Sequence, residues 1–290
     1  MKLMTDYTRF GPAGVPERFK KIVSHISDVP GLLHAEGLTA FEYPAVRWGQ
    51  KPQIKKESAE KLGNQALNND VVLSIHGSYF LNLCGKEDIV EASKRRIIAC
   101  AQAAKWMNAY VVVFHPGFYG KMDKNEALKK CVIELRDIVE TMNGLGIKKV
   151  KIGPETMGKS SQVGSLEEIL TFCEEVEQTH LVIDWGHLHA RHNGLLKEAG
   201  DFRSIINTVE QRLGTQAVRN MHCHFSKIEF TTKGERRHHI LHNKDYGPDF
   251  QLLSEVLVEY KMHPVIISET PLLDLDSIFM RDTLNKAINS

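Results

Sequence analysis

The sequence lacks the features that define several protein classes. Only five cysteines occur among its 290 residues, with no CxxC pair, and they are spread over Cys84, Cys100, Cys131, Cys173 and Cys223. An odd, dispersed set argues against a disulfide framework and indicates a reducing compartment. No apolar stretch reaches the roughly 18 residues of a membrane span, and the N-terminus has no signal-peptide pattern. We therefore expect a cytoplasmic protein without a membrane anchor.

Neither sign of charge is in excess. The 37 basic residues nearly balance the 36 acidic ones, which leaves a formal net charge of +1. The overall charge therefore gives no evidence for a nucleic-acid partner, although a local basic patch is compatible with it. Histidine is the unusual residue, because several of the 14 histidines stand beside Asp, Glu or Gly at the ends of apolar segments. Imidazoles in such places indicate metal or acid–base chemistry.

Short apolar runs alternate with longer amphipathic segments along the whole chain. The apolar runs are typical of buried parallel strands, and the longer segments are typical of helices. The expected strands are 2–10, 37–43, 71–76, 110–115, 149–155, 181–184, 220–225 and 265–269. The expected helices are 16–27, 55–68, 88–107, 124–143, 165–176, 202–213, 250–260 and 273–289.

Strands that each precede a helix predict an α/β protein with the (β/α)8 TIM barrel fold. The 290 residues are close to the roughly 250 that such a barrel takes. The alternative is an open doubly wound sheet, which usually has a glycine-rich phosphate motif, and the segment 11–14 lacks its spacing. No linker interrupts the pattern, so we expect residues 1–290 to form one barrel domain. The long connections 157–164 and 226–247 follow strands and would lie on the active-site face.

Histidines and carboxylates stand at the carboxyl ends of the expected strands. These residues are His76, His115, Glu155, Asp184 with His187 shortly after it, the pair His222 and His224, and Glu269. Barrel closure brings such ends together around one axis. Crowded carboxylates raise one another's pKa, whereas Zn²⁺ or Mn²⁺ would bind both carboxylate and neutral imidazole. One strand-end residue alone is more often a hydrogen-bonded or helix-capping group, so the prediction of a metal centre depends on the combination.

Several motifs resemble those of the endonuclease IV family of apurinic/apyrimidinic endonucleases, which has a xylose isomerase-like TIM barrel. The segments 76–83 (HGSYFLNL) and 114–117 (FHPG) are similar to the family's two histidine motifs. The segments 183–187 (IDWGH) and 269–270 (ET) are similar to its Asp-x-x-His and terminal Glu-Thr motifs. Its strand-seven segment and loops resemble 222–227 (HCHFSK), 237–239 (RHH), Gly158 and 161–164. The resemblance extends over most of the chain.

This resemblance implies a zinc centre. The implied ligands are His76, His115 and Glu155 for one ion, Glu155, Asp184, His222 and Glu269 for a second, and His187 with His238 for a third. The family has an aspartate two residues before the loop histidine, whereas this chain has Arg236 there. Glu235 is the adjacent carboxylate and would replace the aspartate after a local shift. We therefore expect two or three Zn²⁺ per chain, with Mn²⁺ as the alternative metal.

The implied reaction is hydrolysis of the DNA backbone 5′ to an abasic site, as in base excision repair. Glu155 and Glu269 are the candidate catalytic residues, with Glu155 orienting or deprotonating the attacking water. Tyr79 matches a family residue that inserts at the lesion, where an aromatic ring can stack, and packing at the rim is its alternative role. The candidate phosphate contacts are Arg47, Lys227 and Arg237. We expect double-stranded DNA with an abasic site as partner, and neither a membrane nor an obligate protein partner.

A sugar isomerase or epimerase of the xylose isomerase-like barrels is the main alternative. These enzymes resemble this chain at Glu155, Asp184, His187, His222 and Glu269, a set that binds one Mn²⁺ or similar ion. The further imidazoles of His76, His115 and His238 favour the endonuclease, because a single-metal isomerase has no evident need of them. A nucleic-acid-binding barrel without enzymatic activity is a third interpretation, which the nearly complete ligand sets disfavour.

Overall fold

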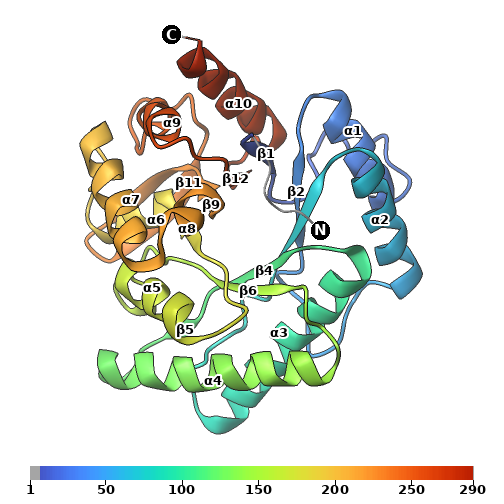
Figure 1. The fold of residues 1–290 in the computed structure, drawn as a ribbon, viewed down its shortest axis with the longest axis vertical. Helices are drawn as coiled ribbons and strands as arrows, with labels where there is room; N and C mark the ends of the chain where they lie inside the picture. The colour runs from blue at the N-terminus through green and yellow to red at the C-terminus, as the bar shows by residue number, and fades with distance from the viewer. Residues whose placement is uncertain (1–6, 290) are drawn as a thin grey trace.

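Parallel strands form a closed ring at the centre of the computed structural model, which describes residues 7–289 (Figure 1). The strands of this ring are β1 Arg9–Pro12, β2 Ala40–Pro44, β3 Val72–His76, β4 Val111–Phe114, β6 Lys151–Pro154, β8 Val182–Asp184, β9 His222–Phe225 and β12 Val265–Ser268. They pair in the orders β1-β12-β9-β8 and β2-β3-β4-β6. Parallel bridges between Ala13 and Glu42 and between Glu155 and Val182 join the two sets. The predicted TIM barrel is confirmed.

The apolar runs of the strands are buried on both faces of the barrel wall. In β4, Val111 and Val113 belong to a small cluster with Val182 and Ile267 from strands elsewhere in the ring. The alternate β4 side chains belong to a larger cluster shared with the helices. A strand buried on both sides needs apolar residues throughout, which explains why these segments show no polar alternation.

Helices surround the strand ring and cover its outer face (Figure 1). They are the 3₁₀ helix η1 Ile26–Asp28 and the α-helices α1 Val29–Ala35, α2 Lys56–Asn68, α3 Glu87–Met107, α4 Lys124–Gly144, α5 Leu166–Glu175, α6 Trp185–Arg191, α7 Ala199–Leu213, α8 Thr215–Arg219, α9 Phe250–Glu259 and α10 Asp274–Ile288. At the start of α5, Ser165 and Glu168 form a reciprocal capping box. Within residues 7–289, no helix is long and apolar enough to cross a membrane.

The prediction of a helix over 16–27 is wrong. That segment consists of turns and η1, and the helix that follows, α1, begins only at Val29. The carboxylate of Asp28 accepts hydrogen bonds from the backbone amides of Ser24 and His25, which holds the chain in a non-helical conformation. Pro30 is suited to the first turn of α1 and disfavours helix before it. The part of the expected first strand at 2–6 lies outside the described residues.

The long connections contain two antiparallel pairs. The connection after β9 forms a hairpin of β10 Lys227–Thr231 and β11 Gly234–His239, which packs against α6. The short strands β5 Gly117–Phe118 and β7 Gln162–Val163 pair between the connections after β4 and β6. These segments were predicted only as loops, and their pairing makes the surroundings of the strand ends an ordered structure.

Candidate metal centre at the carboxyl ends of the strands

The predicted strand-end residues converge at one end of the barrel. His76 closes β3, Asp184 closes β8, and His115, Glu155 and Glu269 follow β4, β6 and β12 directly. Their nitrogen and oxygen atoms fall into groups in which the candidate ligand atoms all lie within 4.8 Å of one another. Residues far apart in the sequence therefore share one focus, as barrel closure predicted.

The first group is His76, His115 and Glu155. Nε2 of His115 lies 3.2 Å from Oε2 of Glu155, and Nε2 of His76 lies 3.5 Å from the same oxygen. Nδ1 of His76 is 3.0 Å from the carbonyl oxygen of Gly77, which can only accept a hydrogen bond. Nδ1 therefore keeps its proton, and Nε2, which faces Glu155, is the nitrogen whose deprotonation gives a metal-binding lone pair. The resulting tautomer is the one that a metal ligand requires.

The second group is Glu155, Asp184, His224 and Glu269. Nδ1 of His224 lies 2.9 Å from Oε1 of Glu155 and 3.3 Å from Oε1 of Glu269. Glu155 thus directs one oxygen toward the first group and the other toward the second. A carboxylate in this position is suited to bridge two ions. Asp184 accepts the backbone N–H of His187 through Oδ1, which leaves its Oδ2 for the focus.

The structure places His224, and not the predicted His222, in this second group. Both side chains point into the barrel because they are two residues apart on β9, but His222 stands one step deeper. Its Nδ1 faces the hydroxyl of Tyr110 and its Nε2 faces Glu42. The segment 222–227 contains two inward-facing histidines. The sequence resemblance selected His222, which lies deeper in the barrel than the other candidate ligands.

The third group is His187, His238 and Glu269. Nδ1 of His187 is 2.9 Å from the carbonyl oxygen of Thr156, and Nδ1 of His238 is 2.8 Å from the hydroxyl of Ser226. Each ring therefore has a fixed orientation and presents its other nitrogen to the focus. The two rings lie edge to face, with centroids 5.7 Å apart.

Glu235 completes the surroundings of the third group, and an irregularity in the hairpin puts it there. Phe230 on β10 pairs with Glu235 and Ile228 pairs with His238, so the register skips one residue of β11. Ile228 and Phe230 are two residues apart and therefore face the same side of the hairpin, and so do the residues opposite them. The bulge thus turns Glu235 and His238 to the same side. Oε2 of Glu235 lies 3.1 Å from Nε2 of His187. The local shift considered for the missing aspartate is thus present.

Arg236 and Gly158 fit this arrangement. The guanidinium of Arg236 points outward and pairs with Glu229 at 2.6 Å. Gly158, in the connection after β6, leaves space for the carboxylate, because a Cβ at that position would stand 2.2 Å from Oε2 of Glu235. The absence of a side chain at 158 therefore lets the hairpin carboxylate approach the centre.

Burial and mutual attraction shift the pKa values in the centre. Burial raises the pKa of Glu155, but the surrounding imidazoles, led by His224, outweigh it and hold this pKa well below its usual value. Burial lowers the pKa of His76, but the carboxylates, led by Glu155, raise it to about 9. The pKa of His187 is raised to about 10 in the same way, chiefly by Asp184. Without ions, protons on these imidazoles balance the carboxylates.

The donor set fits divalent metal ions. Oε2 of Glu155, Oδ2 of Asp184 and Oε2 of Glu235 are buried, and among the described residues only imidazole nitrogens face them. Buried carboxylate oxygens are costly unless a positive charge compensates them. Carboxylate oxygens mixed with imidazole nitrogens are typical ligands of Zn²⁺ and Mn²⁺. The ligand assignments remain predictions, and these buried oxygens support them.

Two centre residues were not assigned from the sequence. His224 was noticed on its strand but given no role, and Glu42 on β2 was not considered. Glu42 is completely buried in the segment Ala40–Pro44, whose neighbouring residues are apolar or aromatic. A carboxylate inside such a strand was the available signal, because buried glutamates are rare unless they are paired.

The predicted DNA-contacting residues have different surroundings. Tyr79 is 53% exposed, and its ring stacks on His115 with centroids 5.5 Å apart. Arg47 and Arg237 are exposed. Lys227, however, is only 9% exposed, and its Nζ donates to the carbonyl oxygen of Asn243 at 2.5 Å. Its ammonium is therefore directed to the backbone of the connection that follows β11, and its contact with phosphate stays a prediction.

Comparison with known proteins agrees with the TIM barrel fold described above. The chain belongs to the xylose isomerase-like TIM barrel family, which matches residues 31–277. It is 31% identical over 284 residues to the uncharacterized protein MJ0133 of Methanocaldococcus jannaschii, covering 96% of this chain and 97% of the relative. It is 26% identical over 220 residues to the probable endonuclease 4 of Ureaplasma urealyticum, covering 73% and 68%.

Solved structures show the same fold. Endonuclease IV from Thermus thermophilus superposes with a TM-score of 0.67 at 16% identity, covering 91% of this chain and 94% of that one. D-psicose 3-epimerase from Clostridium cellulolyticum superposes with a TM-score of 0.61 at 13% identity, covering 92% and 95%. The resemblance to endonuclease IV is confirmed at the level of family and fold. The same fold also includes epimerases, so the reaction is decided by the side chains.

Proposed function

We propose that the protein is a metal-dependent phosphodiesterase of the endonuclease IV type that hydrolyses the DNA backbone 5′ to abasic sites. The observation that carries this proposal is the arrangement of Glu155 between two ligand groups, with its two oxygens facing different sets of imidazoles. Adjacent ions bridged by a carboxylate suit phosphodiester hydrolysis, since they can act on both the attacking and the leaving oxygen. The resemblance to a probable endonuclease 4 supports this reaction class.

Residues of this chain would hold two ions and, with Glu235, a third. His76, His115 and Glu155 would hold one, and Glu155, Asp184, His224 and Glu269 a second. His187, His238 and Glu235 would hold the third. Bound Zn²⁺ or Mn²⁺ supplies a water of lowered pKa and stabilises the charge that develops on the phosphate.

Glu155 and Glu269 are the proposed catalytic carboxylates. Glu155 is completely buried and is fixed from several sides, so it would orient the attacking water. The side chain of Glu269 is 16% exposed, which makes it the more accessible of the two to substrate. Tyr79 stands beside His115 at the rim and would stack where the base is missing. Arg47 and Arg237 would contact phosphates.

Cleavage of a defined duplex tests the function. A duplex with one tetrahydrofuran abasic analogue is incubated with protein reconstituted with Zn²⁺ or Mn²⁺. We expect one cut, 5′ to the analogue, which disappears with a strong chelator and with Glu269→Gln. The undamaged duplex and the matched exposed variant Glu167→Gln are the controls. An intact damaged duplex under every metal condition would exclude the proposal.

An epimerase is the second candidate, because Glu155, Asp184, His224 and Glu269 alone form one complete ligand group. Proton transfer beside a carbonyl needs one ion and no further imidazoles. Incubation with ketohexoses, followed by chromatography of the sugars, separates the two candidates. Epimer formation without duplex cleavage would establish the epimerase and reject the nuclease.

A further inference from the structure

Glu42 places a further carboxylate at the centre from a strand that has no assigned ligand. It lies on β2, is completely buried, and pairs across the sheet with Ser74 of β3. The hydroxyl of Ser74 donates to its Oε2 at 2.8 Å, and Nε2 of His222 lies 3.2 Å from the same oxygen. Oε2 of Glu42 is thus held by Ser74 and His222 inside the barrel.

The other oxygen of Glu42 is in the same condition as the candidate ligands. Oε1 is buried and, among the described residues, is faced only by an imidazole, with Nε2 of His224 at 3.0 Å. Among the residues that the structure describes, the buried carboxylate oxygens in this condition belong to Glu42, Glu155, Asp184 and Glu235. The last three each face one of the three ligand groups. Glu42 belongs to none of these groups, which leaves a separate buried oxygen to be explained.

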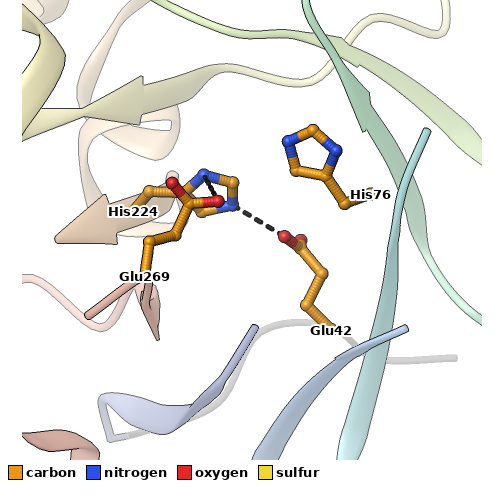
Figure 2. Close-up of side chains that lie close together, drawn as sticks. All are labelled: Glu42, His76, His224 and Glu269. Atoms are coloured by element: carbon orange, nitrogen blue, oxygen red, sulfur yellow. Dashed lines mark ion pairs between the residues drawn. The ribbon is translucent and has the colours of Figure 1, made fainter. Parts of the chain in front are cut away.

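A fourth group of potential ligands surrounds this oxygen. Glu42, His76, His224 and Glu269 each offer an atom within 4.8 Å of the others. Figure 2 shows the carboxylate of Glu42 directed toward the His224 ring, with His76 and Glu269 on neighbouring strand ends. Oε1 of Glu42 lies 3.0 Å from Nε2 of His224, whereas Nδ1 of that ring faces Glu155. A different nitrogen of His224 therefore faces each group.

We propose that Glu42, together with His224 and Glu269, binds a divalent metal ion at a position additional to those assigned above, beside the ring of His76, whose one available nitrogen is assigned to the first ion. Nε2 of His224 and two carboxylate oxygens, completed by water, form a ligand set suited to Zn²⁺, with Mn²⁺ as the alternative. His224 would serve this ion and the second one through its two nitrogens, as an imidazolate. Glu269 has two oxygens and would offer one to this position and one to the second group. Ser74 holds the remaining oxygen of Glu42 and so orients its carboxylate.

Counting bound ions tests this position independently of cleavage. Ion-free protein is titrated with Zn²⁺ and with Mn²⁺ against a chromophoric chelator, and the saturated protein is analysed for metal content. We expect Glu42→Gln to bind one ion fewer than the unaltered protein. The matched variant Glu167→Gln, whose exposed carboxylate lies outside the centre, retains the full count. An equal count in Glu42→Gln and the unaltered protein would overturn the proposal.

A structure of the unaltered protein with Mn²⁺ gives a second test, which does not depend on folding of the variant. We expect an anomalous scattering peak at roughly 2.0–2.5 Å from Oε1 of Glu42, the distance of a direct ligand. A Mn²⁺-saturated crystal without this peak would refute the position. A lower ion count in Glu42→Gln combined with an uncut abasic duplex would support the metal position and reject the nuclease, so the two proposals fail separately.

Discussion

At the scale of single residues, Glu155 connects the first two ligand groups. Its two oxygens face His115 and His224 from one completely buried position. Replacement by glutamine removes the negative charge and puts an amide where one oxygen faces the imidazoles. We expect Glu155→Gln to lower kcat/KM for abasic-duplex cleavage by about 100-fold or more and to weaken Zn²⁺ binding. Steady-state kinetics and chelator competition measure the two effects, and unchanged values for both would contradict the assigned role.

Adjacent residues of β11 provide a matched pair for the third group. Glu235 faces His187 at 3.1 Å, whereas Arg236 is exposed and pairs only with Glu229 across the hairpin. We expect Glu235→Gln to lose one bound ion, as measured by metal analysis. Arg236→Ala should keep the ion count and change the unfolding free energy by no more than about 0.5 kcal/mol, because exposed ion pairs contribute little. Loss of an ion from Arg236→Ala alone would reverse the assignment.

At the scale of elements, the β10–β11 hairpin accommodates one extra residue without turning a candidate ligand away from the centre. The register shift between Glu229 and Phe230 leaves no β10 residue directly opposite Arg236 in the strand register, while Glu235 and His238 keep the same side. Side chains two apart on a regular strand also share a face. Deletion of Arg236 should therefore straighten β11 and keep both ligands directed at the centre.

The deletion is tested by metal content and by circular dichroism. We expect an unchanged ion count and an unfolding midpoint within a few degrees of the parent protein. Insertion of an alanine directly after Arg237 is the contrasting change, because it moves His238 to the opposite face of the strand unless the hairpin shifts again. If the deletion and the insertion lose the ion equally, the bulge has no compensating role.

At the scale of the whole molecule, bound ions and protons are alternative partners of the buried carboxylates. The pKa of His76 is raised to about 9 and that of His187 to about 10 in the ion-free protein. A raised pKa in the folded state stabilises the fold fully below the ordinary value of roughly 6.5, and this contribution is lost as pH rises through the folded pKa. Ions replace the protons and remain effective at higher pH.

Thermal unfolding with and without Zn²⁺ measures this linkage. At about 100 times Kd, a bound ion should raise Tm by roughly 5 °C. We expect the increase to be larger at about pH 8.5 than at about pH 6, because His76 must lose its proton before it binds an ion. The same measurement on protein with strong chelator present gives the ion-free reference. A larger increase at the lower pH would contradict the linkage.

Much of the fold was predictable because its signals are local. Apolar runs such as 110–115 gave strands, and the Ser165 cap gave the start of α5 at nearly the right residue. The segment 16–27 was misassigned because the hydrogen bonds of the Asp28 carboxylate to preceding amides do not appear in its apolar spacing. The hairpin after β9 was missed although residues 227–231 alternate polar and apolar, because both strands are short and β11 is almost entirely polar.

The sequence by itself determined the barrel and the strand-end positions of the candidate ligands His76, His115, Glu155, Asp184 and Glu269, because strand ends are read from local patterns and closure brings them together. Only the tertiary structure decided which of two inward-facing histidines on β9 reaches the centre, and which side Glu235 faces. Register between strands and a single bulge set both, and neither has a signature in the sequence. The position of Glu42 was decided in the same way, since burial and neighbours, and not residue type, give a carboxylate its role.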